Sequence, residues 1–263
     1  MIKVNGQTIE QKHFPDNSLH LTLDFTHFGG TLVVEWHYEN DSELFTVICI
    51  KDYIDAHYPG RGTMLKVPYL PHARMDRVKN YYDVFTLKSF CKVINNLDFD
   101  EVVVSDAHSN VSLGLLDRVV LQQPAYWIEE AKNMSGAEVM FYPDEGAMKR
   151  YSAMTKVPYS FGIKDRDWET GVIKGLNIMN PDAVKGKDVL IVDDICSRGG
   201  TFYHSAKALK EAGANKIYLY VTHLETTVFD GDLINSGLVE QIYTTDSIFP
   251  EDKKTDLITI LKP

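Results

Sequence analysis

The feature that most restricts the possible fold of this chain is an alternation of short apolar runs with amphipathic stretches from about residue 60 onward. Short apolar runs predict buried strands, and the amphipathic stretches between them predict helices. Strands that alternate with helices form βαβ units, whose strands lie parallel in one sheet. We therefore expect an α/β fold with mainly parallel sheets. The predicted strands cover residues 63–70, 101–108, 137–144, 159–164, 188–194, 216–223 and 240–246, and the predicted helices cover residues 84–97, 124–133, 146–154 and 200–214.

The first part of the chain departs from this alternation. Residues 19–25 (LHLTLDF) and 31–38 (TLVVEWHY) are apolar runs on either side of a glycine-containing turn and predict a β-hairpin. Residues 42–57 fit either a strand or a helix, but a parallel sheet needs a crossover at this point, which favours a helix. A weak boundary within VVLQQPAYW divides the chain into predicted domains 1–122 and 123–263.

Charge and cysteine content argue against several classes of function. The chain of 263 residues carries a formal net charge of −10, which disfavours a nucleic-acid-binding surface and leaves focused local sites for anionic ligands. Its three cysteines are far apart and predict no disulfide framework, which fits a reducing environment. Neither a signal peptide nor an apolar run of membrane-spanning length is present. We expect a cytoplasmic protein without a membrane or nucleic-acid partner.

The strongest functional signal lies in residues 189–202, VLIVDDICSRGGTF. The apolar run predicts a strand that ends at Asp193 and Asp194, where the chain leaves the sheet and both carboxylates can reach one ligand. Adjacent carboxylates at the carboxyl end of a parallel strand suit a sugar diol, a magnesium ion, or both. The glycines that follow leave backbone N–H groups open to a phosphate, beside the positive end of a helix that begins near Thr201. The segment therefore predicts a site for a ribose phosphate.

The complete pattern, an apolar run followed by DD, four residues and GGT, is more specific than its parts. It resembles the 5-phosphoribosyl 1-pyrophosphate (PRPP) motif shared by phosphoribosyltransferases and ribose-phosphate pyrophosphokinases. The resemblance implies that the aspartates orient the ribose and that the loop grips its 5-phosphate. The implied ribose-phosphate-binding residues are Asp193, Asp194, Ser197, Arg198, Gly199, Gly200 and Thr201.

Further motifs favour the second of these families, because phosphoribosyltransferases have no ATP site. Two arginines lie in PHARMDR (71–77), which resembles the P-Y-A-R-Q-D-R element of PRPP synthetases and offers bidentate donors to phosphate. A histidine lies in SDAHSN (105–110), which resembles the family's D-L-H-A segment, where it helps to hold the magnesium that carries the ATP phosphates. The resemblance implies ATP contacts for Arg74, Met75, Arg77 and His108.

Two motifs in the second half of the chain imply metal binding and catalysis. Asp144 belongs to YPDEGAMKR, which resembles the family's S-P-D-x-G-x-x-K-R and ends a predicted strand. Lys164 and Arg166 belong to KDRD, which resembles the K-x-R that opens the catalytic flexible loop, and they would neutralise charge on the transferred phosphoryl group. The loop itself would cover residues 165–180. The implied metal ligands are His108, Asp144 and Asp193, with Mg²⁺ as the cofactor.

A last motif implies a contact between subunits. Phe14 and Asp16 lie in HFPDNS, which resembles an R-F-x-D-G-E segment that reaches adenine across a subunit interface; Ser18 stands where Glu is usual. The motifs follow the family's order over nearly the whole chain, without its first strand–helix unit. They imply two tandem phosphoribosyltransferase-like, Rossmann-like domains, assembled as a homodimer or a hexamer of dimers.

The resemblance implies transfer of the β,γ-diphosphate of ATP to the anomeric 1-hydroxyl of ribose 5-phosphate, which yields PRPP and AMP. The phosphate loop departs from the family, because Arg198 replaces a small hydroxyl residue. An added guanidinium suits an acceptor that continues beyond the phosphate, such as ADP-ribose, whose product would be ADP-ribose 1-pyrophosphate for NAD metabolism. A phosphoribosyltransferase and a non-catalytic PRPP-synthetase-like regulator are further alternatives.

Overall fold

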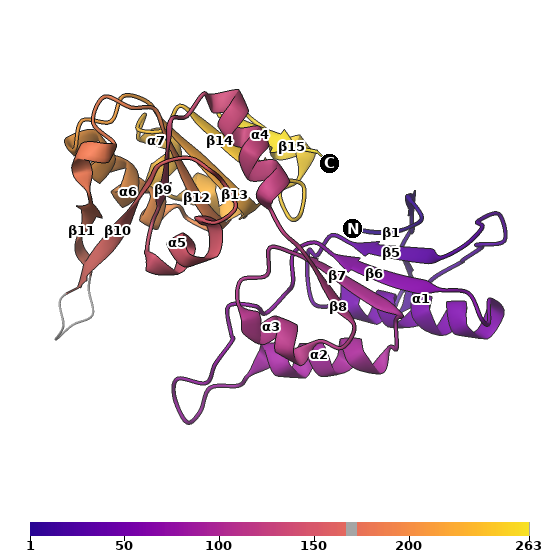
Figure 1. Ribbon diagram of the computed structural model, residues 1–263. Coiled ribbons are helices and arrows are strands. Elements are labelled where there is room, and N and C mark those ends of the chain that lie inside the picture. Colours follow the sequence, from indigo (N-terminus) through magenta and orange to yellow (C-terminus); the bar gives the residue numbers. More distant parts are fainter. Residues whose placement is uncertain (167–172, 263) are drawn as a thin grey trace. The chain divides into compact units, whose positions relative to one another are not determined.

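The structure, a computed structural model, describes residues 1–166 and 173–262, with the backbone alone for residues 164–166 and 173–175. The chain divides into two compact units, Met1–Gln122 and Gln123–Pro263, each with its own sheet (Figure 1). None of the described helices has the length and apolar character needed to cross a bilayer.

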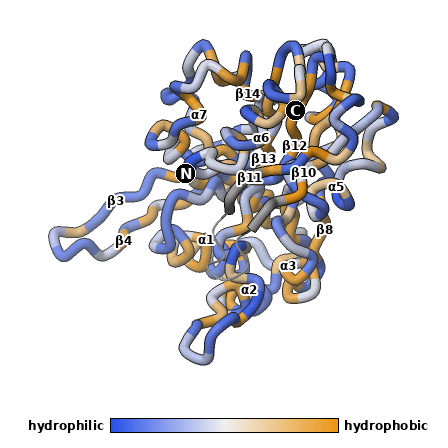
Figure 2. The backbone as a smooth tube through the Cα atoms, turned by 90° about the vertical axis from the view of Figure 1, so that its left-hand side faces the viewer, coloured by the Kyte–Doolittle hydropathy of each residue, from blue (hydrophilic) through white to orange (hydrophobic). Residues whose placement is uncertain are grey.

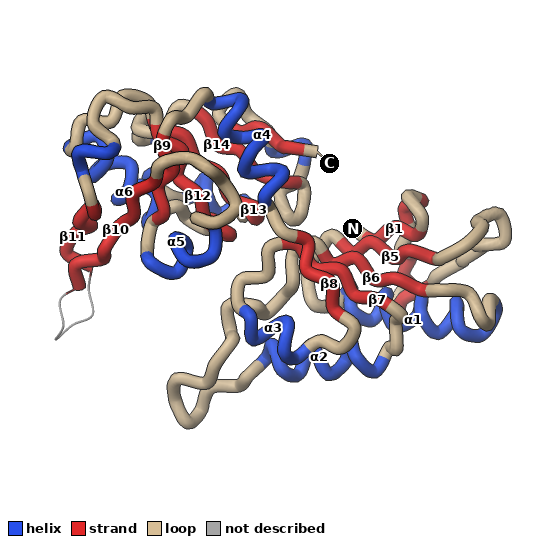
Figure 3. Tube along the Cα trace, viewed as in Figure 1, coloured by secondary structure: helices blue, strands red, loops and turns tan. Residues whose placement is uncertain are grey.

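The first unit contains a mostly parallel sheet in the order β2-β1-β5-β6-β7-β8 (Figure 3). Its strands are β1 (Ile2–Val4), β2 (Gln7–Thr8), β3 (Lys12–His13), β4 (Leu19–His20), β5 (Leu32–Trp36), β6 (Thr63–Val67), β7 (Glu101–Ser105) and β8 (Val119–Gln122), and its helices are α1 (Glu43–His57), α2 (Thr86–Asn96) and α3 (Asn110–Leu115). Strands β5 to β8 run parallel, whereas β1 runs antiparallel to β2 and β5.

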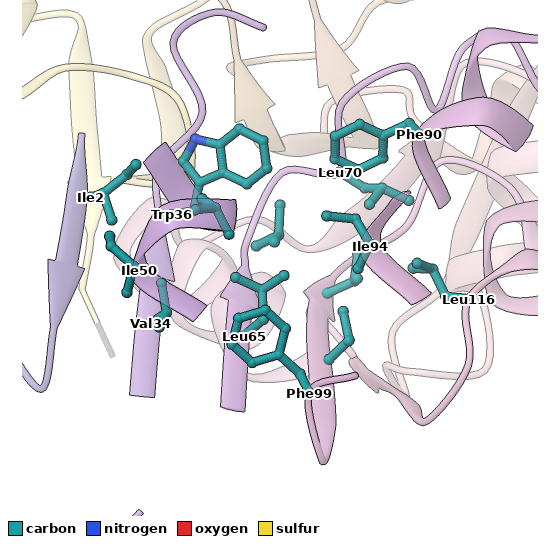
Figure 4. Close-up of a cluster of buried hydrophobic side chains, with 14 of the residues drawn as sticks. Ile2, Val34, Trp36, Ile50, Leu65, Leu70, Phe90, Ile94, Phe99 and Leu116 are labelled. Atoms are coloured by element: carbon teal, nitrogen blue, oxygen red, sulfur yellow. The ribbon is translucent and has the colours of Figure 1, made fainter. Parts of the chain in front are cut away.

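The helices of this unit cover one face of its sheet. The chain moves in a single direction from β5 to β8, so right-handed crossovers place α1, α2 and α3 on the same side. Figure 4 shows the resulting core, in which Trp36 and Leu65 from the strands meet Ile50 and Ile94 from the helices. Each fully buried Leu or Ile in such a core contributes roughly 1.5–3 kcal/mol.

The predicted hairpin between residues 19–25 and 31–38 is wrong. Strand β5 pairs with β1 and β6, whereas β4 pairs with β3 in a small arm that projects from the unit (Figure 2). The predicted helix over residues 42–57 is confirmed by α1.

The residues that follow β4 find side-chain partners instead of a strand. The hydroxyl of Tyr53 on α1 donates to the carbonyl of Leu23 at 2.6 Å, and the amide of Phe25 donates to the Tyr58 hydroxyl at 2.9 Å. Phe25 itself is buried in the core. Because these backbone groups are satisfied by side chains, the segment needs no strand partner.

The second unit contains a sheet in the order β11-β10-β9-β12-β13-β14-β15, in which only the β10–β11 pair is antiparallel. Its strands are β9 (Val139–Tyr142), β10 (Tyr159–Arg166), β11 (Ile173–Met179), β12 (Val189–Cys196), β13 (Ile217–Leu224), β14 (Gln241–Thr245) and β15 (Ile258–Leu261), and its helices are α4 (Ala125–Ser135), α5 (Glu145–Tyr151), α6 (Gly200–Glu211), α7 (Asp232–Asn235) and the 3₁₀ turns η1 (Pro181–Ala183), η2 (Thr226–Asp230) and η3 (Glu251–Lys253). The predicted α/β class with mainly parallel sheets is confirmed.

The strand order of the second sheet reverses between β9 and β12. From β9 the chain crosses through α5 to β10 on one side, and from β12 it crosses through α6 to β13 on the other. Right-handed crossovers in opposite directions place α5 and α6 on opposite faces. Val189 and Ile191 therefore pack with α6, while Leu190 and Val192 pack with α5 and α4. Strand β12 is consequently apolar on both faces, as its sequence indicates.

The flexible loop expected over residues 165–180 is wrong for residues 173–179, which form β11 antiparallel to β10. Leu176 and Ile178 pack against the α6 side of the core, and this alternating burial explains the strand. Residues 165–166 of the predicted loop belong to β10, and residues 167–172 lie outside the described residues.

Candidate active site

The candidate site lies at the carboxyl end of the second sheet, where the strand order reverses. Asp144 follows β9, and Asp193 and Asp194 lie near the end of β12, which pairs with β9 in parallel. Residues 197–199 then connect β12 to α6. Open α/β sheets bind ligands in the crevice at such a reversal. The fold thus brings these acidic residues and the predicted phosphate loop to one edge of one sheet.

Asp193 and Asp194 lie inside β12 rather than after it. The strand continues to Cys196 because β13 is long enough to pair with its last residues, so the chain does not leave the sheet at the carboxylates as predicted. Side chains alternate along a strand, which places Asp193 on the α6 side and Asp194 on the α5 side. The amide of Asp194 donates to the Asp193 carboxylate at 2.9 Å.

Arg150 on α5 is a charged partner that the sequence reasoning did not assign. Its Nη1 lies 3.6 Å from Oδ2 of Asp194, whose side chain is nearly buried. A buried carboxylate needs such a partner because losing its hydration is costly. The sequence contained a signal for this contact, since Arg150 is the last residue of the YPDEGAMKR motif and lies on α5, the helix that Asp144 caps.

Asp193 lies at the centre of the negative charge. Burial raises the pKa of Asp193 well above its ordinary value, and the charges of Asp194 and Asp144 raise it further. Three carboxylates that repel one another at a strand edge form a place where a cation binds favourably. A bound cation would therefore reduce the repulsion among these carboxylates.

The donor set fits Mg²⁺, which takes oxygen ligands and is usually held by one or two carboxylates together with water and substrate phosphates. A complete cage of three or more His, Cys, Asp or Glu side chains is not found among the described residues. Asp144 also caps α5, since its Oδ1 accepts a hydrogen bond from the amide of Ala147 at 3.0 Å. The third predicted ligand, His108, belongs to the first unit.

The phosphate loop begins α6 and presents its backbone to solvent. Gly199, the residue before the helix, has φ +76°, a left-handed conformation that favours glycine. A Cβ at Gly200 would meet no heavy atom within 4 Å, so there is open space beside the first turn. Gly200 and Thr201 are first-turn residues whose N–H groups have no partner within the helix. An anion bound here would receive these donors together with the helix dipole.

The back of the loop is fixed by the segment after β13. The Ser197 hydroxyl lies 3.1 Å from that of Thr227 on η2. A Cβ on Gly231 would lie 1.8 Å from the carbonyl oxygen of Arg198, and a Cβ on Gly199 would lie 2.8 Å from the Cβ of Leu233. The backbone of the loop therefore rests directly on η2 and α7, a long-range contact that no local sequence pattern indicates.

The side chain of Arg198 is exposed, although its carbonyl is tightly packed. Within the described part of the chain, no ion pair or hydrogen bond joins its guanidinium to another residue. Its charge is therefore available to a ligand at the mouth of the loop.

Four of the predicted nucleotide-binding residues of the first unit follow neighbouring strands at one edge of its sheet. Arg74, Met75 and Arg77 follow β6, and His108 follows β7, the parallel neighbour of β6. Both arginines are exposed, and Nε of Arg77 lies 3.4 Å from Oδ1 of Asp76. Parallel strands end at the same edge, so these side chains lie where a bound phosphate chain would be expected.

Phe14 and Asp16 lie at the tip of the β3–β4 arm. The hydroxyl and the amide of Ser18 donate to the same Asp16 oxygen at 2.6 and 3.0 Å, and these bonds lower the pKa of Asp16. Phe14 is 51% exposed, with its ring 5.0 Å from that of His20. Ser18, which departs from the family's glutamate, thus shapes the tip of the arm.

Lys164 and Arg166, the predicted catalytic pair, belong to β10, which runs parallel to β9. Their backbone therefore lies toward the carboxyl edge that also carries Asp144 and Asp193. Their side chains are outside the described residues.

Comparisons with known proteins agree with this fold. A family model described as "Phosphoribosyl synthetase-associated domain" matches residues 174–261. A ribose-phosphate pyrophosphokinase of Vibrio parahaemolyticus is 31% identical over 80% of this chain and 68% of its own, and one of Sulfurisphaera tokodaii is 29% identical over 99% and 91%. The crystal structure of phosphoribosylpyrophosphate synthetase from Mycobacterium smegmatis has a TM-score of 0.77, with 18% identity over 97% of this chain and 85% of that one.

The raised pKa of Asp193 predicts a stabilising substitution. A carboxyl group whose folded pKa is raised stabilises the fold while it is protonated and loses that contribution as the pH rises through the folded pKa. Without ligand or Mg²⁺, Asp193→Asn should therefore raise the melting temperature at neutral pH, and the gain should shrink as the pH falls to the ordinary range of Asp. Differential scanning calorimetry across pH measures this; a gain that grows toward acid pH would contradict it.

The contact between Gly231 and the loop predicts a distant effect on acceptor use. Gly231→Ala should push the Arg198 carbonyl aside and misplace the phosphate donors, which lowers kcat/KM for the acceptor by about 100-fold. The KM for ATP should change little. Gly114→Ala, where a Cβ meets nothing within 4 Å, is the control. Equal kinetics for the two variants, both folded by circular dichroism, would show that the loop does not depend on this contact.

Proposed function

This chain belongs to the ribose-phosphate pyrophosphokinase family, and we propose that it transfers the β,γ-diphosphate of ATP to the anomeric 1-hydroxyl of ribose 5-phosphate, which yields PRPP and AMP. The observation that carries this proposal is the meeting of Asp144, Asp193 and Asp194 with a glycine loop where the strand order reverses. It is an enzyme of the diphosphokinase type.

The second unit binds the acceptor. The N–H groups of Gly200 and Thr201 hold the 5-phosphate at the start of α6. Asp193 and Asp194 accept hydrogen bonds from the ribose hydroxyls and orient the anomeric hydroxyl. Arg150, whose Nη1 lies 3.6 Å from Oδ2 of Asp194, balances the negative charge of that acceptor carboxylate.

The first unit binds ATP. Arg74 and Arg77 donate to the phosphate chain at the carboxyl edge of β6, and His108 helps to position it from the end of β7. Phe14 stacks on adenine, and Asp16 accepts from its amino group. The projection of the β3–β4 arm supports an adenine contact made in a second copy of the chain, and hence a homodimer or a hexamer of dimers.

The transfer step exchanges one phosphorus–oxygen bond for another. The anomeric oxygen bonds to the β-phosphorus of ATP, the bond from that phosphorus to the α–β bridging oxygen breaks, AMP departs, and the hydroxyl proton passes to solvent. Lys164 and Arg166 neutralise the charge that spreads over the transferred group. Positioning and electrostatics supply most of the rate, since phosphoryl transfer needs little covalent help from the protein.

Mg²⁺ is the cofactor that these residues fit. Asp144 and Asp193 of the second unit would hold it together with substrate oxygens, and it would supply positive charge to the phosphates when bound. His108 is the metal ligand proposed for the first unit. The raised pKa of Asp193 supports this assignment, because a cation lowers the repulsion between the carboxylates.

A second candidate acceptor is ADP-ribose, which would give ADP-ribose 1-pyrophosphate by the same chemistry. The observation in its favour is the exposed guanidinium of Arg198, which has no described protein partner at the mouth of the loop. A single terminal phosphate is served by the loop's N–H groups, whereas a diphosphate offers a further anionic group to Arg198.

The acceptor is decided by incubating the full chain with MgATP and each acceptor and measuring AMP. We expect AMP with at least one of them, and none without Mg²⁺. If ADP-ribose is used, Arg198→Thr should lower kcat/KM for ADP-ribose by about tenfold, as for a lost hydrogen bond to a charged group, and spare ribose 5-phosphate. No AMP with either acceptor would reject the proposal and favour a phosphoribosyltransferase or a non-catalytic regulator.

The role of the catalytic pair predicts a separation of rate from binding. Lys164→Ala should lower kcat by about 100- to 1,000-fold, because it removes a charge that acts mainly in the transition state. The Kd for ATP, measured by calorimetry, should change little. Lys156→Ala, on the loop that precedes β10, serves as a control with the same loss of charge. Unchanged turnover in Lys164→Ala would disprove its assigned role.

A further inference from the structure

A groove lies between α6 and α7 in the second unit, outside the residues assigned above. Its volume is about 410 Å³, and its lining residues are Tyr203 and Lys207 from α6 together with Asp232, Asn235, Ser236 and Leu238 from α7 and the segment after it. The two helices pack against each other along this groove. The lining therefore combines an aromatic ring, a cation, a carboxylate and an amide.

The groove begins on α6, the helix that follows the phosphate loop. The amide of Tyr203 donates to the Gly199 carbonyl at 2.8 Å, so the backbone of Tyr203 lies one helical turn from the loop. On α7, the buried Leu233, next to the lining residue Asp232, packs against Gly199. With a rise of 1.5 Å per residue, Tyr203 and Lys207 lie about 5 and 11 Å along the helix from Gly200. A ligand at the helix start can thus extend into the groove.

The chemistry of the lining matches a nucleoside. A tyrosine face stacks on a flat heterocycle, and its partly buried position on α6 limits its freedom. The amide of Asn235 can donate to and accept from a base edge. The carboxylate of Asp232 suits the diol of a ribose, and Lys207 offsets the negative charge of a phosphate nearby. Arg198, exposed at the mouth of the loop, is a further cation that can bind a phosphate group.

We infer that the α6–α7 groove is a subsite for a nucleoside monophosphate group carried on the 5-phosphate of the acceptor. Arg198 binds the diphosphate that joins the two halves, and Tyr203 stacks on the base. This assignment rests on the proposed diphosphoryl transfer with ADP-ribose, the second candidate acceptor. With that acceptor, the groove favours a nucleoside diphosphate sugar with a free anomeric hydroxyl over the simple sugar phosphate.

Binding without ATP tests the groove separately from the reaction. The full chain with Mg²⁺ is titrated by calorimetry with ADP-ribose, ribose 5-phosphate and free AMP. Tyr203→Ala and Lys207→Ala should each weaken ADP-ribose binding by about tenfold and leave ribose 5-phosphate within about twofold. Tyr126→Ala is the matched control, because Tyr126 is 60% exposed on α4, a helix that packs on the opposite face of the sheet.

Each outcome decides the assignment. If ADP-ribose affinity is the same in the wild type and both groove variants, or if ADP-ribose does not bind, the subsite is wrong. If AMP binds in a Tyr203-dependent manner and ADP-ribose does not, the groove serves a free nucleotide and the proposal is also wrong. If the variants lose ADP-ribose binding while the wild type forms no AMP from ATP, the groove is upheld and the proposed transfer fails.

Discussion

The reversal of strand order between β9 and β12 governs the second unit and everything placed on it. Because crossovers are right-handed, the reversal puts α5 and α6 on opposite faces, and β12 becomes apolar on both. The only part of that strand which can carry charge is its carboxyl end. Asp193 and Asp194 lie there, in a place where charge is costly to hold without a ligand. The strand order that builds the fold therefore also places these carboxylates at the proposed binding site.

The two sheets differ because their strand orders differ. The first sheet has no reversal from β5 to β8, so its helices share one face and its ligand residues come from successive strand ends. Arg74, Arg77 and His108 are spread along that edge, which suits an elongated phosphate chain. The second sheet concentrates its ligands at one point, which suits a compact sugar. Each strand order thus suits the shape of the substrate that we propose for that unit.

The sequence was sufficient for the features that depend on local pattern. Apolar runs located the parallel strands, and the spacing of DD and GGT predicted an acceptor site within one βα unit. The predicted hairpin failed because its segment is held by Tyr53 and Tyr58, which lie 30 and 33 positions after the residues they bond and give no local signal. The extension of β12 past its carboxylates failed for the same reason, since it depends on the length of β13.

The candidate site shows the same division. The acidic residues and the loop were predicted residue by residue and lie at one edge of one sheet, whereas the residues that support them were not predicted. Arg150 could have been found from its motif, but the contact of Gly231 with Arg198 depends on how η2 and α7 return to the loop. Residues that contact a ligand tend to fall in short motifs, while residues that fix those motifs are distributed by the fold.

The main chain and the side chain of Arg198 lie in different environments. Its carbonyl is packed against Gly231 and belongs to the framework, while its side chain extends into solvent at the mouth of the site. An exchange of the side chain there has little effect on the free energy of folding, since surface substitutions away from packed contacts rarely do. The side chain at position 198 can therefore change in evolution while the backbone that holds it stays fixed. If that side chain binds the acceptor as proposed, a new substrate range can arise without a compensating change in the core.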